Sequence, residues 1–178
     1  EDWRVLAGKM PYPWQRTASY FFDGDVNPEG LAVQWRRGAD GLFGSAFYTH
    51  LAERGTRADS NMLGLQLGWR GKVLDDGRLT LAAAYFDHGA VEGYNPFWNN
   101  SADNAFGNTV IANPAICRRG IPTCLANDFD VLEVQAEYTT ELGGRPLTLF
   151  ADLARNLAAE RGDPVLGVEA GLDTAYSA

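Results

Sequence analysis

Hydrophobic and polar residues alternate with a period of two along most of this chain. The clearest example is residues 63–70, which read Leu-Gly-Leu-Gln-Leu-Gly-Trp-Arg. Successive side chains of a β-strand point to opposite faces, so this pattern gives a strand one apolar and one polar face. Strands are predicted at residues 2–8, 30–37, 42–51, 61–71, 78–87, 129–140, 146–156 and 165–173. The pattern therefore predicts an all-β protein with about eight strands in this chain.

Two of these segments allow a second interpretation. Residues 150–160 are rich in Ala and Leu, which suits a helix, but Pro146 and the flanking alternation favour a strand. Residues 42–51 are apolar on both sides, so either side is a plausible lipid face. The two candidate sets are Phe43, Phe47 and Leu51 on one side and Leu42, Ala46 and Tyr48 on the other.

The connections between the strands alternate in length. Short turns are predicted at 38–41, 75–77 and 143–145, and longer links at 9–29, 53–59, 88–128 and 159–163. Each strand has about the 9–11 residues that a tilted strand needs to cross a bilayer. Short turns on one side and longer loops on the other are typical of outer-membrane barrels. We therefore expect residues 9–29 and 88–128 to form extracellular loops.

The aromatic residues distinguish a membrane barrel from a soluble sandwich, which alternation alone does not. Trp35, Trp69 and Tyr138 fall on the apolar faces near the short turns, and Tyr85 falls near the opposite end. Amphipathic rings are favoured at the depth of lipid headgroups. The central stretches of the apolar faces also carry no charge. Both features favour an antiparallel transmembrane up-and-down β-barrel.

Composition narrows the class of protein further. The chain has 178 residues, 46% of them hydrophobic, and a mean hydropathy of -0.24. It contains no run of the roughly 18 apolar residues that a membrane helix needs, which excludes a helical membrane protein. A net charge of -8 disfavours nucleic-acid binding. Cys117 and Cys124 lack the further ligands of a metal site, so we expect a disulfide formed in an oxidising compartment.

The polar faces of the strands supply candidate residues for the lining of a pore. They are Gln34, Arg36, Gln66, Arg70, Glu133, Gln135, Glu137, Asp152 and Glu169. In a porin these side chains face water, and opposite charges on facing walls orient solutes. The alternative is that they are solvated or pair with one another inside a closed barrel. The acidic residues of the last three strands suggest a preference for cations.

Three further features have a functional and a plain interpretation. In the 88–128 loop, Arg118 and Arg119 are candidates for a pore mouth, although a surface loop closed by its disulfide explains the same residues. Oxygen-bearing side chains alternate in the preceding long loop and suggest a structural calcium site, but a turn-forming role accounts for them better. Those residues are Asp23, Asp25, Asn27 and Glu29. No residue pattern indicates catalysis, so an enzyme is not predicted.

Several stretches carry a family resemblance. They are 7–14 (Ala-Gly-Lys-Met-Pro-Tyr-Pro-Trp), 22–32 (Phe-Asp-Gly-Asp-Val-Asn-Pro-Glu-Gly-Leu-Ala), the run from Asn127 to Gly143, and 146–152. With them the chain resembles a porin family of Gram-negative bacterial outer membranes. The resemblance implies a longer chain with more strands, and residues 176–178 lack the terminal aromatic of a closing strand. The expectation is therefore one part of a larger barrel.

The expected function is passive diffusion of small hydrophilic solutes or ions across the bacterial outer membrane. The expected partners are membrane lipid and those solutes, a homo-oligomer is compatible with this interpretation, and no cofactor beyond the weak calcium candidate is predicted. Two alternatives remain. One is a secreted soluble all-β module that binds carbohydrate through its exposed aromatic rings. The other is a small closed β-barrel that serves as a membrane anchor, whose interior its own side chains would fill.

Overall fold

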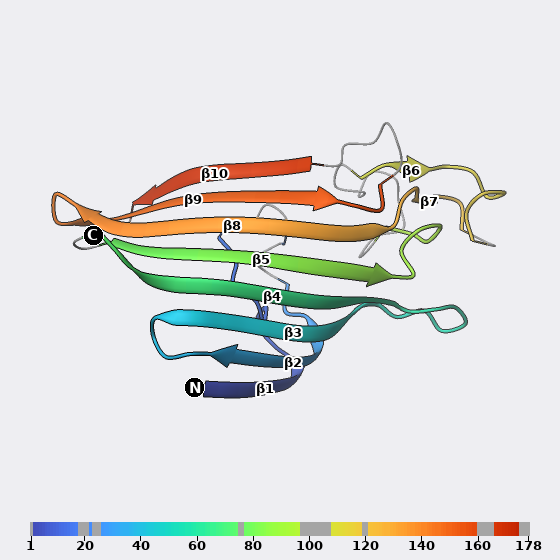
Figure 1. The fold of residues 1–178 in the computed structure, drawn as a ribbon. Coiled ribbons are helices and arrows are strands. Elements are labelled where there is room, and N and C mark those ends of the chain that lie inside the picture. The colour runs from blue at the N-terminus through green and yellow to red at the C-terminus, as the bar shows by residue number, and fades with distance from the viewer. Residues whose placement is uncertain are drawn as a thin grey trace.

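The computed structural model describes residues 2–17, 22, 26–74, 77–96, 108–118, 121–159 and 166–174. Eight of its strands form one antiparallel sheet in which neighbours in sequence, apart from the loop strands β6 and β7, are neighbours in space (Figure 1). They are β1 (Asp2–Lys9), β2 (Glu29–Arg36), β3 (Gly41–Ala52), β4 (Ser60–Val73), β5 (Gly77–Gly89), β8 (Phe129–Leu142), β9 (Arg145–Asn156) and β10 (Leu166–Thr174). The eight predicted strands are thereby confirmed, including a strand rather than a helix over most of 150–160.

The sheet is not closed into a barrel within the described residues. Strand β1 pairs only with β2, and β10 pairs only with β9, so both are edge strands. A second, two-stranded sheet pairs β6 (Val110–Ile111) with β7 (Cys124–Leu125) inside the long connection between β5 and β8. The sequence pattern did not predict that short ribbon. The described residues form no helix that is long and apolar enough to cross a membrane.

Tight turns join the strands at one end of the sheet, where glycine supplies the backbone geometry. Gly143 and Gly144 have φ angles of 61° and 76° between β8 and β9, a left-handed conformation that a side chain disfavours. Between β2 and β3, Arg37 donates its backbone N–H to the Leu42 carbonyl oxygen at 2.8 Å. The chain can therefore reverse within a few residues at this end, while the other end carries the long connections.

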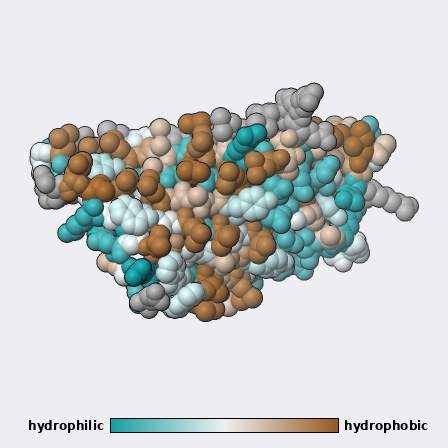
Figure 2. All heavy atoms as spheres, viewed as in Figure 1, coloured by the Kyte–Doolittle hydropathy of each residue, from teal (hydrophilic) through white to brown (hydrophobic). Residues whose placement is uncertain are grey.

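One face of the sheet is apolar and exposed. Leu31, Leu67 and Val168 keep 60%, 60% and 64% of their surface accessible, and no second layer of described residues covers them. Figure 2 views this face, where hydrophobic side chains gather over the strands and hydrophilic ones gather toward the end with the long loops. The aromatic residues Trp3, Trp35, Trp69 and Tyr138 share this face near the tight turns. Below, it is called the outer face.

The opposite face, called the inner face below, holds the buried polar residues. Gln66 is 1% exposed, Glu133 2% and Asp152 4%, although each lies on a strand of a single sheet. In β3 the registers place Phe43 and Phe47 on this face and Leu42 and Tyr48 on the outer one. This decides the ambiguity of the third predicted strand. A segment of chain must cover the inner face, because the sheet alone would leave these residues open to solvent.

Candidate functional site

Residues 10–17, called the crossing segment below, lie across the inner face. After β1 ends, the Met10 N–H donates to the Pro28 carbonyl oxygen at 3.0 Å. The chain then passes β2, where the Gln34 side-chain amide donates to the Pro13 carbonyl oxygen at 2.9 Å. It reaches β9, where the Thr17 hydroxyl donates to Asp152 at 3.1 Å. The segment thus runs perpendicular to the strands over most of the sheet, within a loop that was expected to be extracellular.

Gln15 is the centre of the contacts that hold this segment. Its backbone N–H donates to Gln66 Oε1 at 2.7 Å, and its carbonyl oxygen accepts from Gln66 Nε2 at 2.9 Å and from Gln135 Nε2 at 2.7 Å. Its side-chain oxygen accepts a hydrogen bond from Arg70 Nη2 at 2.7 Å. A partly buried backbone group needs partners, and the side chains of Gln66 and Gln135 supply them here. The inner polar residues of β4 and β8 therefore serve as a docking site for one loop residue.

An aromatic cluster adds apolar contact beside these hydrogen bonds. Trp14 is 5% exposed and stacks on Phe47, with ring centroids 4.4 Å apart and planes 17° apart. Phe86 meets the same indole edge-on at 5.3 Å. Rings of this size contribute a large buried apolar area, so they fix the segment against the sheet. Part of the inner face is therefore a hydrophobic core rather than a solvated wall.

The crossing segment divides the inner face into two halves. The covered half contains Glu133, Gln135 and Asp152 of β8 and β9, all less than 5% exposed. There, Gln135 Nε2 also reaches Glu133 Oε2 at 3.4 Å, and Glu133 lies beside Asp152. These carboxyl groups were expected to face an open lumen and to attract cations. Their burial instead makes them part of the packing beneath residues 10–17.

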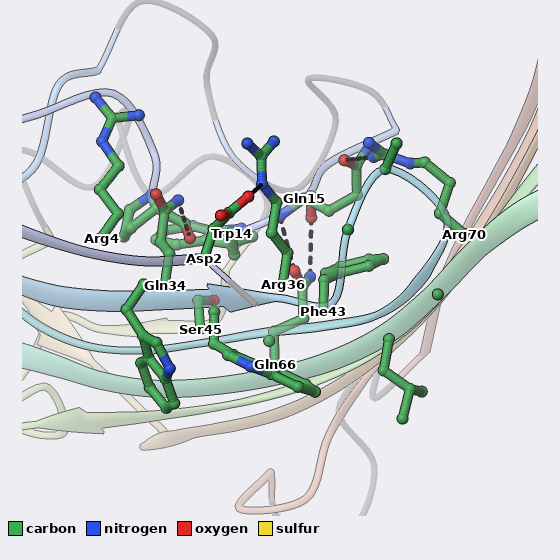
Figure 3. A pocket seen from close by; sticks show the side chains of 18 residues that line it. Asp2, Arg4, Trp14, Gln15, Gln34, Arg36, Phe43, Ser45, Gln66 and Arg70 are labelled. Atoms are coloured by element: carbon green, nitrogen blue, oxygen red, sulfur yellow. Dashed lines mark hydrogen bonds and ion pairs between the residues drawn. The ribbon is translucent and has the colours of Figure 1, made fainter.

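The open half borders a pocket of about 510 Å³ on β1 to β4 (Figure 3). Arg4, Arg36 and Arg70 line it, and their guanidinium groups lie on the same side of the strands. Asp2 is the one carboxylate among the described lining residues and pairs with Arg36 at 3.1 Å. The amides of Gln15, Gln34 and Gln66, the hydroxyl of Ser45 and the rings of Trp14 and Phe43 complete the labelled wall.

The predicted pore-lining residues all lie on the inner face, but their surroundings differ. The cross-strand registers put Gln34, Arg36, Gln66, Arg70, Glu133, Gln135, Glu137, Asp152 and Glu169 on that face. Glu169 pairs with Asp152 across β9 and β10, and its side chain lies outside the described residues. The two arginines border the open pocket, whereas Gln66 and the residues of the covered half hold the crossing segment.

The long connection between β5 and β8 is held together by its own contacts. The predicted disulfide between Cys117 and Cys124 is present. Arg118 lies over the ring of Tyr94, 5.4 Å from its centroid, and Arg54 lies 4.2 Å from the same ring. Partial burial lowers the pKa of Arg54, and the charges of Tyr94 and then Asp59 oppose that shift. Arg119, the other residue predicted at a pore mouth, is outside the described residues.

The calcium candidates fall mostly outside the described part of the chain. This applies to Asp23 and Asp25, whereas Asn27 precedes β2 and Glu29 begins it, paired with Lys9 and His50. Among the described residues, no group of three or more His, Cys, Asp or Glu side chains is arranged to hold a metal ion. The structure therefore supplies no support for a metal centre there.

The residues that hold the inner face together were missed from the sequence. Trp14, Gln15 and Thr17 belong to a loop, and Arg4 and Ser45 belong to strands whose polar faces were not assigned. One signal was available: Trp14 follows Pro11-Tyr12-Pro13, and such an apolar stretch in a loop needs a surface to pack against. Compared with known protein families, curated proteins and solved structures, the chain matches none of them.

Proposed function

We propose that these strands belong to a porin-type β-barrel of a bacterial outer membrane, through which small hydrophilic solutes diffuse passively. The observation that carries this proposal is the reversed polarity of the sheet. Leu31, Leu67 and Val168 of the outer face are more than half exposed, while Gln66, Glu133 and Asp152 of the inner face are nearly inaccessible. Water-soluble proteins bury the first kind of residue and expose the second. Membrane barrels with a polar interior do the opposite.

The outer face is costly in water and favourable in lipid. Exposed apolar area costs roughly 25 cal/mol per Å², and monomeric soluble proteins rarely expose contiguous apolar patches above a few hundred Å². Trp3 and Trp35, with ring centroids 6.3 Å apart, lie on the outer face near the tight turns, and Tyr48 and Tyr85 lie on it toward the opposite end. Two belts of rings around a charge-free centre match the interfaces and the hydrocarbon of a bilayer.

The proposal requires the open edges of the sheet to be paired. In hydrocarbon each unpaired backbone N–H or C=O group costs several kcal/mol, so only closed sheets cross membranes. We therefore propose that further strands pair with β1 and β10 to close the barrel. A larger strand number also leaves room for solutes beside the crossing segment, because the interior of an eight-stranded barrel is filled by its side chains. Membrane lipid is then the partner of the outer face. The proposed barrel is also compatible with a homo-oligomer.

The test uses the intact protein that contains this chain. It should stay in solution only with detergent, migrate faster on a gel before boiling than after, and produce stepwise conductance in planar bilayers. A water-soluble particle with one gel mobility would contradict the proposal and favour a secreted carbohydrate-binding module. A heat-modifiable protein without conductance would favour a membrane anchor. The three results are distinct, so the experiment decides between the three functions.

A further inference from the structure

We propose that the pocket of the open half binds a small organic oxyanion, a carboxylate or a phosphate, through Arg4 and Arg36, with Arg70 at its far side. This inference rests on the proposed channel function, of which it names the solute class. It predicts a preference for anions, which is the reverse of the cation preference that the acidic residues of the last three strands suggest from sequence. Of those acidic residues, Glu133 and Asp152 are covered, and none of the four is among the described residues that line the pocket. The charges that a solute meets in the described part of the pocket are therefore mainly the guanidinium groups.

The charge of the pocket wall is unbalanced. Among the described residues, its lining carries three guanidinium groups and one carboxylate, in a chain whose net charge is -8. Arg4 pairs across the strands with Gln34, and Arg36 is the next residue on the same face of β2. Such diagonal neighbours lie about 7–8 Å apart at their Cα atoms, within reach of one another for long side chains. An anion between them relieves the repulsion of two neighbouring cations.

The three arginines differ in how many of their side-chain N–H donors are already bound to other residues. The Arg4 side chain makes no hydrogen bond or ion pair with the residues that the structure describes. Arg36 uses Nε for Asp2 in an ion pair whose two side chains are 67% and 62% exposed. Arg70 is bound to Thr80 and Gln15 and so has fewer donors left. Guanidinium groups bind carboxylates and phosphates in a two-pronged geometry, for which Arg4 and Arg36 keep free donors.

Groups at the floor of the pocket suit a ligand that carries hydroxyl groups beside its anionic headgroup. Ser45 is 7% exposed, and its hydroxyl has no hydrogen-bond partner among the described residues. It lies opposite Gln34 in one register and opposite Gln66 in the next. An unpaired buried hydroxyl costs free energy, which a ligand hydroxyl would recover. The volume of the pocket lies within the range of roughly 300–1,000 Å³ that is typical of small-molecule sites.

The binding experiment follows the intrinsic tryptophan fluorescence of the intact protein in detergent at low ionic strength. The ring of Trp14 lies in the pocket wall and reports its occupation, whereas the rings of Trp3 and Trp35 lie on the outer face. The probes are gluconate, glucose 6-phosphate and uncharged glucose, which have similar bodies and different headgroups. Saturable binding of one or both anions, without binding of glucose, is expected, and the tighter anion identifies the headgroup. Equal binding of glucose, or no saturable binding of either anion, would overturn the proposal.

Two variants connect that binding to the named residues. Replacement of Arg4→Gln together with Arg36→Gln should weaken anion binding by about tenfold for each arginine lost. The matched control, Arg57→Gln with Arg155→Gln, removes the same charge outside the pocket lining and should bind as the parent does. Unchanged gel mobility before boiling verifies that each variant is folded. Equal loss in the control and the pocket variant would show that only overall charge matters, which also overturns the proposal.

Conductance separates this inference from the function on which it rests. In a salt gradient the parent channel should favour anions more than the Arg4→Gln/Arg36→Gln variant, as the sign and size of the reversal potential show. A channel that conducts without anion binding or without this shift leaves the porin function intact and refutes the site. Anion binding without conductance refutes the porin function instead.

Discussion

The covered and open halves of the inner face have the same pattern of alternating polar residues and very different surroundings. On β8 and β9, Glu133 and Asp152 are 2% and 4% exposed beneath the crossing segment. On β1 and β2, Arg4 and Arg36 are exposed and border the pocket. Alternation assigns a side chain to a face of the sheet, but it does not reveal what lies on that face. The charges on one face of a sheet therefore indicate which solutes it attracts only where that face stays open.

The two halves also differ in how their polar groups are satisfied. In the covered half, Gln135 binds the backbone of Gln15, as Gln66 does at the border between the halves, so polar side chains replace water as partners of a loop. In the open half, Ser45 and Arg4 lack partners among the described residues. The first arrangement stabilises one conformation, whereas the second leaves binding capacity for a solute.

Loss of the Trp14 ring should have the largest effect, because it uncovers the covered half. Trp14→Ala is expected to weaken docking of the crossing segment by about 3–5 kcal/mol, the usual cost of removing a buried indole. Both native cysteines are in the disulfide, so an Ala84→Cys substitution provides a free thiol within the buried cluster around Trp14. A water-soluble thiol reagent should label it much faster in the Trp14→Ala background.

The control for this experiment is Trp3→Ala, which removes an indole from the outer face that is 69% exposed. Labelling of Ala84→Cys should then stay slow. If Trp14→Ala leaves the labelling rate unchanged as well, the crossing segment is held without the indole, and the distinction between the two halves does not depend on it.

An intermediate effect is expected where the floor of the open half is tightly packed. A Cβ atom at Gly68 would overlap the ring of Phe43 and lie 2.7 Å from the Leu81 carbonyl oxygen. Gly68→Ala should therefore lower the free energy of unfolding by about 1–3 kcal/mol through overpacking. Denaturant unfolding in detergent measures this, with Gly55→Ala as the control because nothing lies within 4 Å of its added Cβ. Equal stability of both variants would mean that Phe43 moves aside freely.

The smallest effect is expected from the ion pair at the edge of the pocket. Asp2→Asn should change stability by no more than about 0–1 kcal/mol, because both partners are exposed. It should nevertheless tighten gluconate binding by about two- to threefold, since Arg36 loses its competing carboxylate. Asp40→Asn removes a similar pair with Arg78 outside the pocket and should leave gluconate binding unchanged. Tighter binding in both variants would indicate an effect of net charge alone.

The strands were predictable because their signal is local. The alternation of residues 63–70 alone predicts one apolar and one polar face, whatever the rest of the chain contains. These residues lie in β4 as expected. Glycines at 143 and 144 likewise mark a turn through their own conformational freedom. The third strand was ambiguous because Phe43 and Phe47 are apolar residues on the inner face, where an aromatic cluster and the pocket use them.

The covering of the inner face was not predictable because it depends on contacts between distant parts of the chain. Thr17 and Asp152 are 135 residues apart, and Gln15 and Gln135 are 120 apart. No spacing rule relates such pairs. The sequence alone therefore places the acidic residues in a lumen and gives Arg4 no role. The disulfide was predicted correctly because seven positions separate its cysteines.

The span of the crossing segment has a consequence for the order of assembly. Contacts between residues far apart in sequence form slowly, because a long loop must close before they stabilise anything. The hydroxyl of Thr17 can meet its carboxylate only after the seventh strand of the sheet has been added. During assembly, Trp14 can pack on Phe47 and Phe86 once β3 and β5 are present, but the far end of the crossing segment gains its contact with Asp152 only when β9 is added. An assembly intermediate that lacks β9 therefore leaves this end of the segment undocked and open to proteases and chaperones.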